Sequence, residues 1–209
     1  GDSDYTIREY ICNFIMSKLE TNQVDPSTGT TLTLGTSGDT IAIPSGVTIA
    51  NSGTATGFGG NNTPAFFATL SADQSISDTS ATKVQINNEI YDTANAYDNS
   101  SNYRFTPQTA GKYIIYSGIM INGDSDNDIE VAELYLNKNS TVTAQATFDS
   151  STNYLREVPL SLTFSVDMNG SSDYVEMYVY ADFVSGGGTV KGHSDPRART
   201  YFGAYKLVE

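Results

Sequence analysis

The sequence predicts an all-β protein, and three observations lead to that prediction. Short runs rich in Val, Ile, Thr, Tyr and Phe, which are typical of strands, recur along most of the chain. Clusters of Gly, Ser, Asn and Asp, which favour turns, separate these runs. Some runs, such as LSLTFSV at 160–166, alternate apolar and polar residues as a half-buried strand does. Many short strands joined by turns indicate a sandwich or a jelly roll.

The composition limits the classes of partner. The chain has 209 residues, which suits one medium domain with an appendage or two small domains. Its 24 acidic and 11 basic residues give a net charge of −13, which argues against a nucleic-acid partner. Cys12 is the single cysteine, so the fold must be held by packing rather than by an intrachain disulfide. No apolar run is long enough to insert in a bilayer, and Arg8 and Lys18 make a signal peptide unexpected.

The first of three predicted regions, residues 1–29, is an attachment segment with a short helix. Residues 5–19 carry apolar side chains at helical spacing on an otherwise polar segment. Such a helix either packs on its own domain or docks on a larger assembly. We favour docking, because the following segment is too polar to offer a core. The expected docking stripe is Ile7, Ile11, Phe14 and Ile15.

The second region, residues 30–63, has thin apolar pairs separated by Gly-Ser-Asp and Pro-Ser-Gly turns. One chain cannot bury such edges, whereas three chains wound about a common axis could, which predicts a trimeric β shaft. A flexible Gly/Thr/Ser linker is the alternative. The segments GDTIAIPSG at 38–46 and GTATGFG at 53–59 resemble parts of bacteriophage fibre proteins. The apolar pairs are Leu32/Leu34, Ile41/Ile43 and Val47/Ile49.

The third region, residues 64–209, contains an ordered set of landmarks. Asn87, the pair Tyr97-Asp98, Phe105 and then Gly-Lys-Tyr at 111–113 follow one another, and the region closes on YFGAYKL at 201–207. This order resembles the globular head shared by complement subcomponent q and the tumour necrosis factor (TNF) superfamily. The resemblance implies a ten-stranded jelly-roll head that forms homotrimers and binds partners rather than catalysing a reaction.

The chain departs from that family in two places. Ser140 follows Lys-Asn at a position where the family prefers Gly. A Thr/Gly-rich shaft stands where the complement branch has a collagen-like stalk, which points to a viral or bacterial member.

Tyrosine is the most abundant aromatic residue, with 14 copies. In the resembled family, aromatic residues of the inner sheet stack about the threefold axis. The alternative is ordinary strand composition, since Tyr has a high β-propensity. The resemblance suggests Tyr113, Tyr178, Tyr201 and Tyr205 as trimer-interface residues.

An acidic loop at 123–130, GDSDNDIE, sets Asp124, Asp126 and Asp128 at alternate positions, as calcium loops do. The match to an EF-hand then fails, because Ile129 stands where Gly is needed and Tyr135 where Glu is needed. We favour a solvated acidic loop, and calcium bound by these three aspartates is the alternative. No other cofactor is expected.

Three loops are candidate receptor contacts: Asp124–Asp128, Ser150–Asn153 and Gly186–Pro196. The lone His193 cannot form a zinc site or a catalytic relay without partners from elsewhere. No nucleophile elbow, P-loop or dinucleotide fingerprint is present, so we expect no enzyme activity. The ligand-binding candidates are Asp124, Asp126, Asp128, Tyr154, His193 and Arg197.

Together these features predict a homotrimeric phage tail fibre or spike on the exterior of the virion, extracellular when free. The N-terminal segment would contact other virion proteins, and the head would bind a glycan or protein of the host surface. Weak contacts become strong when several fibres engage at once. Two alternatives remain: a capsid decoration or head-fibre protein, and a secreted binding module of the same superfamily.

Overall fold

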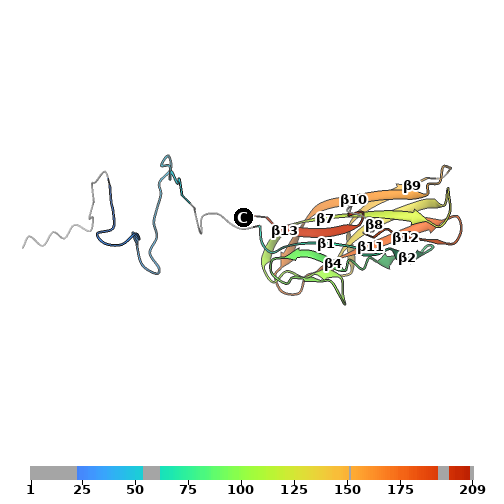
Figure 1. Ribbon diagram of the computed structural model, residues 1–209, viewed down its shortest axis with the longest axis horizontal. Coiled ribbons are helices and arrows are strands. Elements are labelled where there is room, and N and C mark those ends of the chain that lie inside the picture. Colours follow the sequence, from blue (N-terminus) through green and yellow to red (C-terminus); the bar gives the residue numbers. More distant parts are fainter. Residues whose placement is uncertain (1–22, 54–61, 151, 193–197, 208–209) are drawn as a thin grey trace, which may run out of the picture. The chain divides into compact units, whose positions relative to one another are not determined.

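The computed structural model describes residues 23–53, 62–150, 152–192 and 198–207 (Figure 1). The chain divides into two compact units, Gly1–Thr54 and Ala55–Glu209. The predicted N-terminal helix and its docking stripe (Ile7, Ile11, Phe14 and Ile15) lie outside the described residues.

Within the first unit, residues 23–53 contain turns but neither helix nor strand. Both predicted turns are present: the Asp39 N–H donates to the Thr36 carbonyl at 3.0 Å, and the Val47 N–H donates to the Pro44 carbonyl at 3.2 Å. Seven large apolar side chains in and around these turns remain between 43% and 61% exposed in the single chain. They are Val24, Leu32, Leu34, Ile41, Ile43, Val47 and Ile49.

The described residues of the second unit form β-strands joined by turns and loops, with no helix, which confirms the all-β prediction. Ten of its thirteen strands have four or more residues, and β3, β5 and β6 have only two. The strands are β1 (Ala65–Thr69), β2 (Gln74–Ser77), β3 (Thr82–Lys83), β4 (Asn88–Asp92), β5 (Tyr97–Asp98), β6 (Arg104–Phe105), β7 (Ala110–Gly123), β8 (Ile129–Lys138), β9 (Thr141–Asp149), β10 (Glu157–Asn169), β11 (Val175–Phe183), β12 (Gly187–Val190) and β13 (Tyr201–Lys206).

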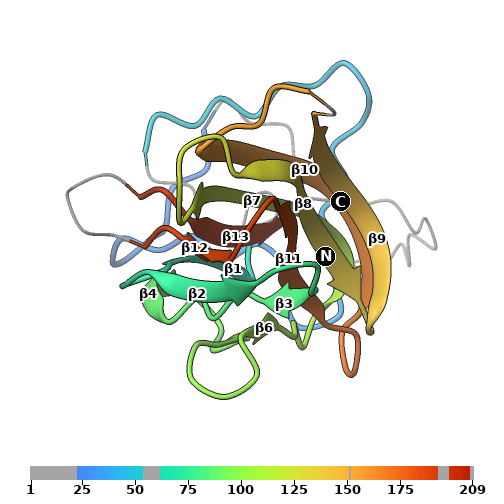
Figure 2. The same cartoon turned by 90° about the vertical axis from the view of Figure 1, so that its right-hand side faces the viewer.

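These strands form two sheets with antiparallel pairing, and the head is a jelly roll, as the resemblance implied. The first sheet has the order β2-β12-β7-β13-β1-β4, and β10 pairs with the other edge of β7. The second sheet has the order β5-β6-β11-β8-β9, and β3 also pairs with β11. In Figure 2, β7 and β13 lie on one side of the head and β9 lies on the other.

The core lies between the sheets and follows the alternation of the strands. On β7, Tyr113, Ile115, Ile119 and Ile121 are buried, while Ile114 and Tyr116 point away from the core and are half-buried. Four consecutive large apolar residues at 113–116 would suit a strand buried on both faces, but in the single chain only one face of this segment is fully buried. The second sheet contributes Leu134, Leu136, Met177, Val179 and Ala181 to the core.

The Tyr97-Asp98 pair has separate structural roles for its two side chains. The Tyr97 ring stacks on Phe66 with centroids 4.4 Å apart, and its hydroxyl donates to the Ile86 carbonyl at 2.8 Å. Burial raises the pKa of this hydroxyl well above its usual value. The Asp98 carboxylate accepts backbone N–H groups of the next loop, at 2.9 Å from Ser101 and 3.0 Å from Ser100. One residue therefore anchors the core and the other orders a polar loop.

Replacing Asp98 should weaken the head in a pH-dependent way. The Ser101 and Ser100 N–H groups hold the pKa of Asp98 well below its usual value of 3.8. Because the folded pKa is the lower one, the stabilisation is complete above about pH 4 and is lost as the pH falls further. We expect Asp98→Ala to lower the free energy of unfolding at pH 7 by about 1–2 kcal/mol, as loss of a capping side chain does.

Urea denaturation at pH 7 and at pH 3 measures this effect. The gap between wild type and Asp98→Ala should narrow at the lower pH. Glu89→Ala, which removes an exposed carboxylate on β4, is the control and should change stability little at either pH. A gap that stayed constant with pH would contradict the assigned role of Asp98.

Candidate functional site

Five aromatic side chains gather on the outer surface of the first sheet, the surface that points away from the core. Phe67 is at the centre: its ring centroid lies 6.2 Å from Tyr91, 6.2 Å from Tyr116 and 6.1 Å from Tyr201. Tyr116 continues the cluster to Tyr205 at 6.3 Å. Such distances are typical of interacting aromatic pairs. We call Phe67, Tyr91, Tyr116, Tyr201 and Tyr205 the aromatic face.

Two glycines allow these rings to lie against the backbone of the sheet. Tyr201 is paired with Gly118 across β13 and β7, and Gly203 is paired with Tyr116. A Cβ atom on Gly118 would lie 2.6 Å from the Tyr201 ring, and one on Gly203 would lie 2.3 Å from the Tyr116 ring. Each glycine thus leaves the space that the opposite ring fills. The Tyr116 and Tyr201 rings can therefore lie close against the backbone of the sheet.

The aromatic face combines apolar rings with polar tips. The hydroxyls of Tyr91 and Tyr116 are 3.4 Å apart, and burial raises the pKa of Tyr116 well above its usual value. The phenol therefore stays neutral over the physiological range. The neighbouring strand β10 presents Ser161, Thr163 and Ser165 outward, so polar residues border the face. An apolar centre with a polar rim is the usual composition of a protein interface.

The four tyrosines predicted for the trimer interface lie in three different parts of the head. Tyr201 and Tyr205 belong to the aromatic face. Tyr113 is fully buried, and its hydroxyl donates to the Thr109 carbonyl at 2.8 Å, so it belongs to the core. Tyr178 lies on the outer surface of the second sheet, with the Lys83 ammonium 5.6 Å from its ring centroid.

Sequence reasoning missed Phe67, Tyr91 and Tyr116 as members of the aromatic face. A signal for Tyr116 and Phe67 was present, because both alternate with residues that are buried in the core. Tyr116 and Gly118 on one strand, and Tyr201 and Gly203 on the other, also share the same two-residue spacing. The cross-strand pairing that places each ring over a glycine is absent from the sequence of either strand alone.

The three aspartates of the acidic loop do not converge. Asp126 pairs with Arg156 at 2.9 Å, and its carboxylate is largely exposed. Asp128 is buried, and one of its oxygens accepts the Ser185 N–H at 3.1 Å. Across the described ranges, no three His, Cys, Asp or Glu side chains are arranged as metal ligands. In this arrangement Asp128 ties two loops together, and the three residues do not form the alternating ligand set of a calcium loop.

The remaining residues and loops predicted to contact a ligand lie in several different places. Tyr154 is half-buried in the connection before β10. The Ser150 hydroxyl closes the neighbouring loop by donating to the Asn153 carbonyl at 2.8 Å. The predicted loop Gly186–Pro196 is partly a strand, since Gly187–Val190 forms β12 and pairs with β2 and β7. His193 and Arg197 lie outside the described residues.

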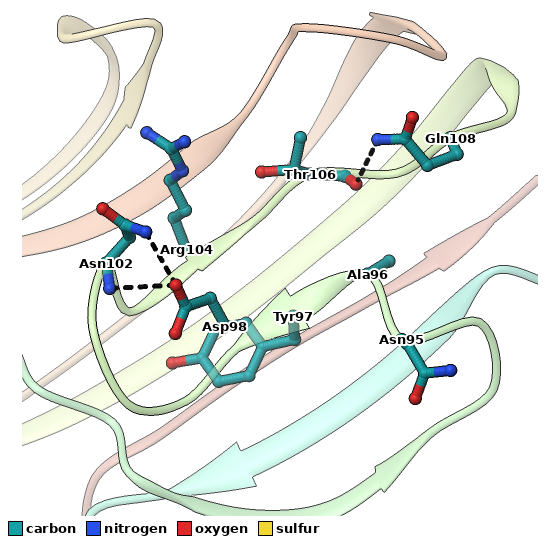
Figure 3. A pocket seen from close by; sticks show the side chains of 8 residues that line it. All are labelled: Asn95, Ala96, Tyr97, Asp98, Asn102, Arg104, Thr106 and Gln108. Carbon is teal, nitrogen blue, oxygen red and sulfur yellow. Dashed lines mark hydrogen bonds between the residues drawn. The ribbon is translucent and has the colours of Figure 1, made fainter.

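A polar hollow of about 410 Å³, shown in Figure 3, lies beside β5 and β6 and was not predicted from the sequence. The Arg104 guanidinium at its edge stacks on the Tyr174 ring at 4.4 Å. Asp98 accepts the Asn102 side-chain amide at 2.7 Å, so its carboxylate is engaged by the loop. The hollow could accept hydrogen-bonding ligands. Its lining is Asn95, Ala96, Tyr97, Asp98, Asn102, Arg104, Thr106 and Gln108.

Comparison with known proteins gave matches among solved structures but none among sequences. No protein-family model matches the chain, and no curated protein sequence matches it. Among solved structures, the chain is similar to the crystal structure of murine APRIL at pH 5.0, with a TM-score of 0.47 and 11% identity. The match covers 68% of this chain and 99% of that chain. The jelly-roll fold follows from the strand order and register of the head. In the part of the chain that the structure describes, no helix is long and apolar enough to cross a membrane.

Adding a methyl group at Gly203 should disturb the aromatic face. In Gly203→Ala the new Cβ would overlap the Tyr116 ring, which must leave its position over the sheet. We expect a loss of about 1–3 kcal/mol in the free energy of unfolding, as for other overpacked sites. Near-ultraviolet circular dichroism should show a changed tyrosine signal.

A double-mutant cycle isolates the contact between residues 203 and 116. In the Tyr116→Ala background the ring is absent, so Gly203→Ala should be tolerated with much less destabilisation. Equal destabilisation in both backgrounds would show that the glycine is needed for another reason.

Proposed function

We propose that this chain is a homotrimeric, non-enzymatic binding protein of fibre type in which the aromatic face packs between copies. The observation that carries the proposal is the aromatic face itself: five clustered rings on a sheet surface that the single chain leaves partly uncovered. Contiguous exposed apolar patches on soluble proteins mark interaction sites. Self-association in threes is proposed because the sequence resembles heads that are trimeric.

The first unit supports the same assembly. Its apolar side chains between residues 24 and 49 are largely exposed in one chain, although they alternate as strand residues do. Burying them against two further copies would remove this apolar surface from water, at a gain of about 25 cal/mol per Å². A three-chain shaft over 30–63 followed by a jelly-roll head is the arrangement we propose.

We further propose that the protein is a phage tail fibre or spike whose head binds a glycan or protein on the host surface. The resemblance of 38–46 and 53–59 to bacteriophage fibre segments and the strongly acidic composition support this role. The protein would then lie on the exterior of the virion, with its N-terminal segment contacting other virion proteins.

Substituting Tyr116 with a charged residue should weaken the trimer. Native mass spectrometry or light scattering of the wild type should give three times the 22.5 kDa chain mass. Tyr116→Lys places a strongly hydrated charge in the aromatic face and should raise the concentration at which the trimer dissociates by at least about tenfold. Tyr180→Lys makes the same change on the outer surface of the second sheet and should leave the mass unchanged.

One result would contradict the proposed trimer. A well-folded wild-type chain that stays monomeric at micromolar concentration would remove the basis for both the shaft and the aromatic interface.

Binding to cells distinguishes host recognition from a purely structural role. The fluorescently labelled full chain, incubated with a panel of bacterial hosts, should bind some strains and should compete with infection by the parent phage. A protein that coats capsids but binds none of the cells would favour a decoration or head-fibre role instead. A protein that binds no cells can still be a trimer, so host recognition and trimer formation are tested separately.

A further inference from the structure

The outer surface of the second sheet contains a second hollow, of about 400 Å³. It lies over β8 and β11 and beside the hairpin that joins β8 to β9. Its volume is within the range of small-molecule sites, about 300–1,000 Å³. We call it the tyrosine hollow, and its lining is Ala81, Tyr135, Asn137, Ser140, Val142 and Tyr178.

Two tyrosine rings contribute to the hollow in fixed positions. Tyr135 and Tyr178 are directly opposite each other in the pairing of β8 with β11. The Tyr135 hydroxyl donates to the Glu133 carboxylate, and the Tyr178 hydroxyl donates to the Glu176 carboxylate at 3.5 Å. Each ring is therefore fixed at its backbone and at its hydroxyl. Because the two side chains are already ordered, a ligand loses less affinity to the entropic cost of immobilising them.

One polar atom of the hollow lacks a partner. The side-chain oxygen Oδ1 of Asn137 is buried and has no hydrogen-bond partner within the described residues. A buried acceptor without a donor costs free energy, and native proteins rarely leave one unpaired. Asn137 as a whole is only half-buried, so a turn of its side chain towards the hollow would let a ligand donate a hydrogen bond to this oxygen and remove the cost.

Ser140 adds a hydroxyl to the lining at an unfavourable backbone position. Asn139 and Ser140 form the two-residue turn between β8 and β9, with φ angles of 50° and 64°. Gly is preferred at such positions, because other residues adopt positive φ at a cost. The Ser140 hydroxyl lies 2.9 Å from the Tyr174 hydroxyl. The two-residue hairpin requires positive φ at both positions, so the turn fixes where the Ser140 hydroxyl lies.

The charges around the hollow select against anions. Glu133 accepts hydrogen bonds from Tyr135, Gln145 and Thr147. All three donors are neutral, so none of them neutralises the negative charge of Glu133. Glu176 is balanced by Lys83 at 2.6 Å. An anionic ligand would approach a net negative edge, and a pure hydrocarbon would leave Asn137 unpaired.

We infer that the tyrosine hollow binds a neutral pyranose sugar. The apolar C–H face of the ring would lie against Tyr135 and Tyr178, and a sugar hydroxyl would donate to Oδ1 of Asn137. Amphipathic aromatic side chains beside a few fixed polar groups suit a ligand with one apolar face and several hydroxyls. This inference rests on the proposed binding function and names the class of its ligand.

Saturation-transfer NMR on the full chain tests the inference. The probes are the methyl glycosides of glucose, galactose, mannose and N-acetylglucosamine, with N-acetylneuraminic acid as the anionic comparison. At least one neutral glycoside should bind, with the strongest transfer to the C–H protons of one ring face. Asn137→Ala and Tyr178→Ala should each weaken that binding by about tenfold or more, while Tyr180→Ala, on the same face of β11 but outside the lining, should not.

Ser140→Gly separates binding from folding. This variant relieves the positive φ and should raise the Tm, yet it removes the hydroxyl and should weaken sugar binding. The inference is overturned if no neutral glycoside binds, if only the anionic sugar binds, or if Asn137→Ala and Tyr178→Ala bind as the wild type does. The mass of each variant is measured alongside: a trimer that binds no sugar contradicts this inference alone, and a monomer that binds sugar contradicts only the assembly.

Discussion

The side chains of β7 alternate between two apolar surfaces, and the architecture of the head depends on that alternation. Tyr113, Ile115 and Ile119 enter the core, while Tyr116 lies on the opposite side of the same strand. A shift of one residue in the register of β7 would exchange the two sets and lose both surfaces. The pairing with β13 fixes the register further, since Gly203 must stand opposite Tyr116.

Local features of the chain could be predicted from the sequence, whereas features of the assembled sheets could not. Alternation along 160–166 correctly predicted a strand, and the Gly- and Pro-containing turns at 36–39 and 44–47 form as expected. Both are local properties of the chain. Which side of a strand faces the core is a property of the assembled sheets, which is why Tyr113 and Tyr178 were grouped with Tyr201 although the three lie on different surfaces.

Surfaces built across strands were the hardest to predict. The members of the aromatic face come from β1, β4, β7 and β13, and the tyrosine hollow joins β8, β11 and a hairpin. The segment 187–190 carries two glycines and reads as a loop, yet it pairs with β2 and β7. In the acidic loop, carboxylates close in sequence have separate partners, Arg156 and the backbone N–H of Ser185, which spacing along the chain could not show.

Polar loops of the head are ordered by side chains that bond to nearby backbone. Asp98 accepts the N–H groups of Ser100 and Ser101, and the side-chain oxygen of Asn169 accepts those of Ser171 and Ser172. These contacts satisfy backbone groups that no strand pairs. They explain how a chain so rich in Ser, Asn and Asp keeps defined loops without a disulfide.

The exposed aliphatic side chains of residues 24–49 have a consequence for the order in which the two units of the chain fold. The head buries its core within one chain, so no other copy has to supply core residues to it. On the assembly proposed above, the N-terminal segment can fold only after other copies arrive. Joined heads would confine three such segments at a high effective concentration. Trimer formation would then proceed from the carboxyl end towards the amino end, against the direction of synthesis on the ribosome.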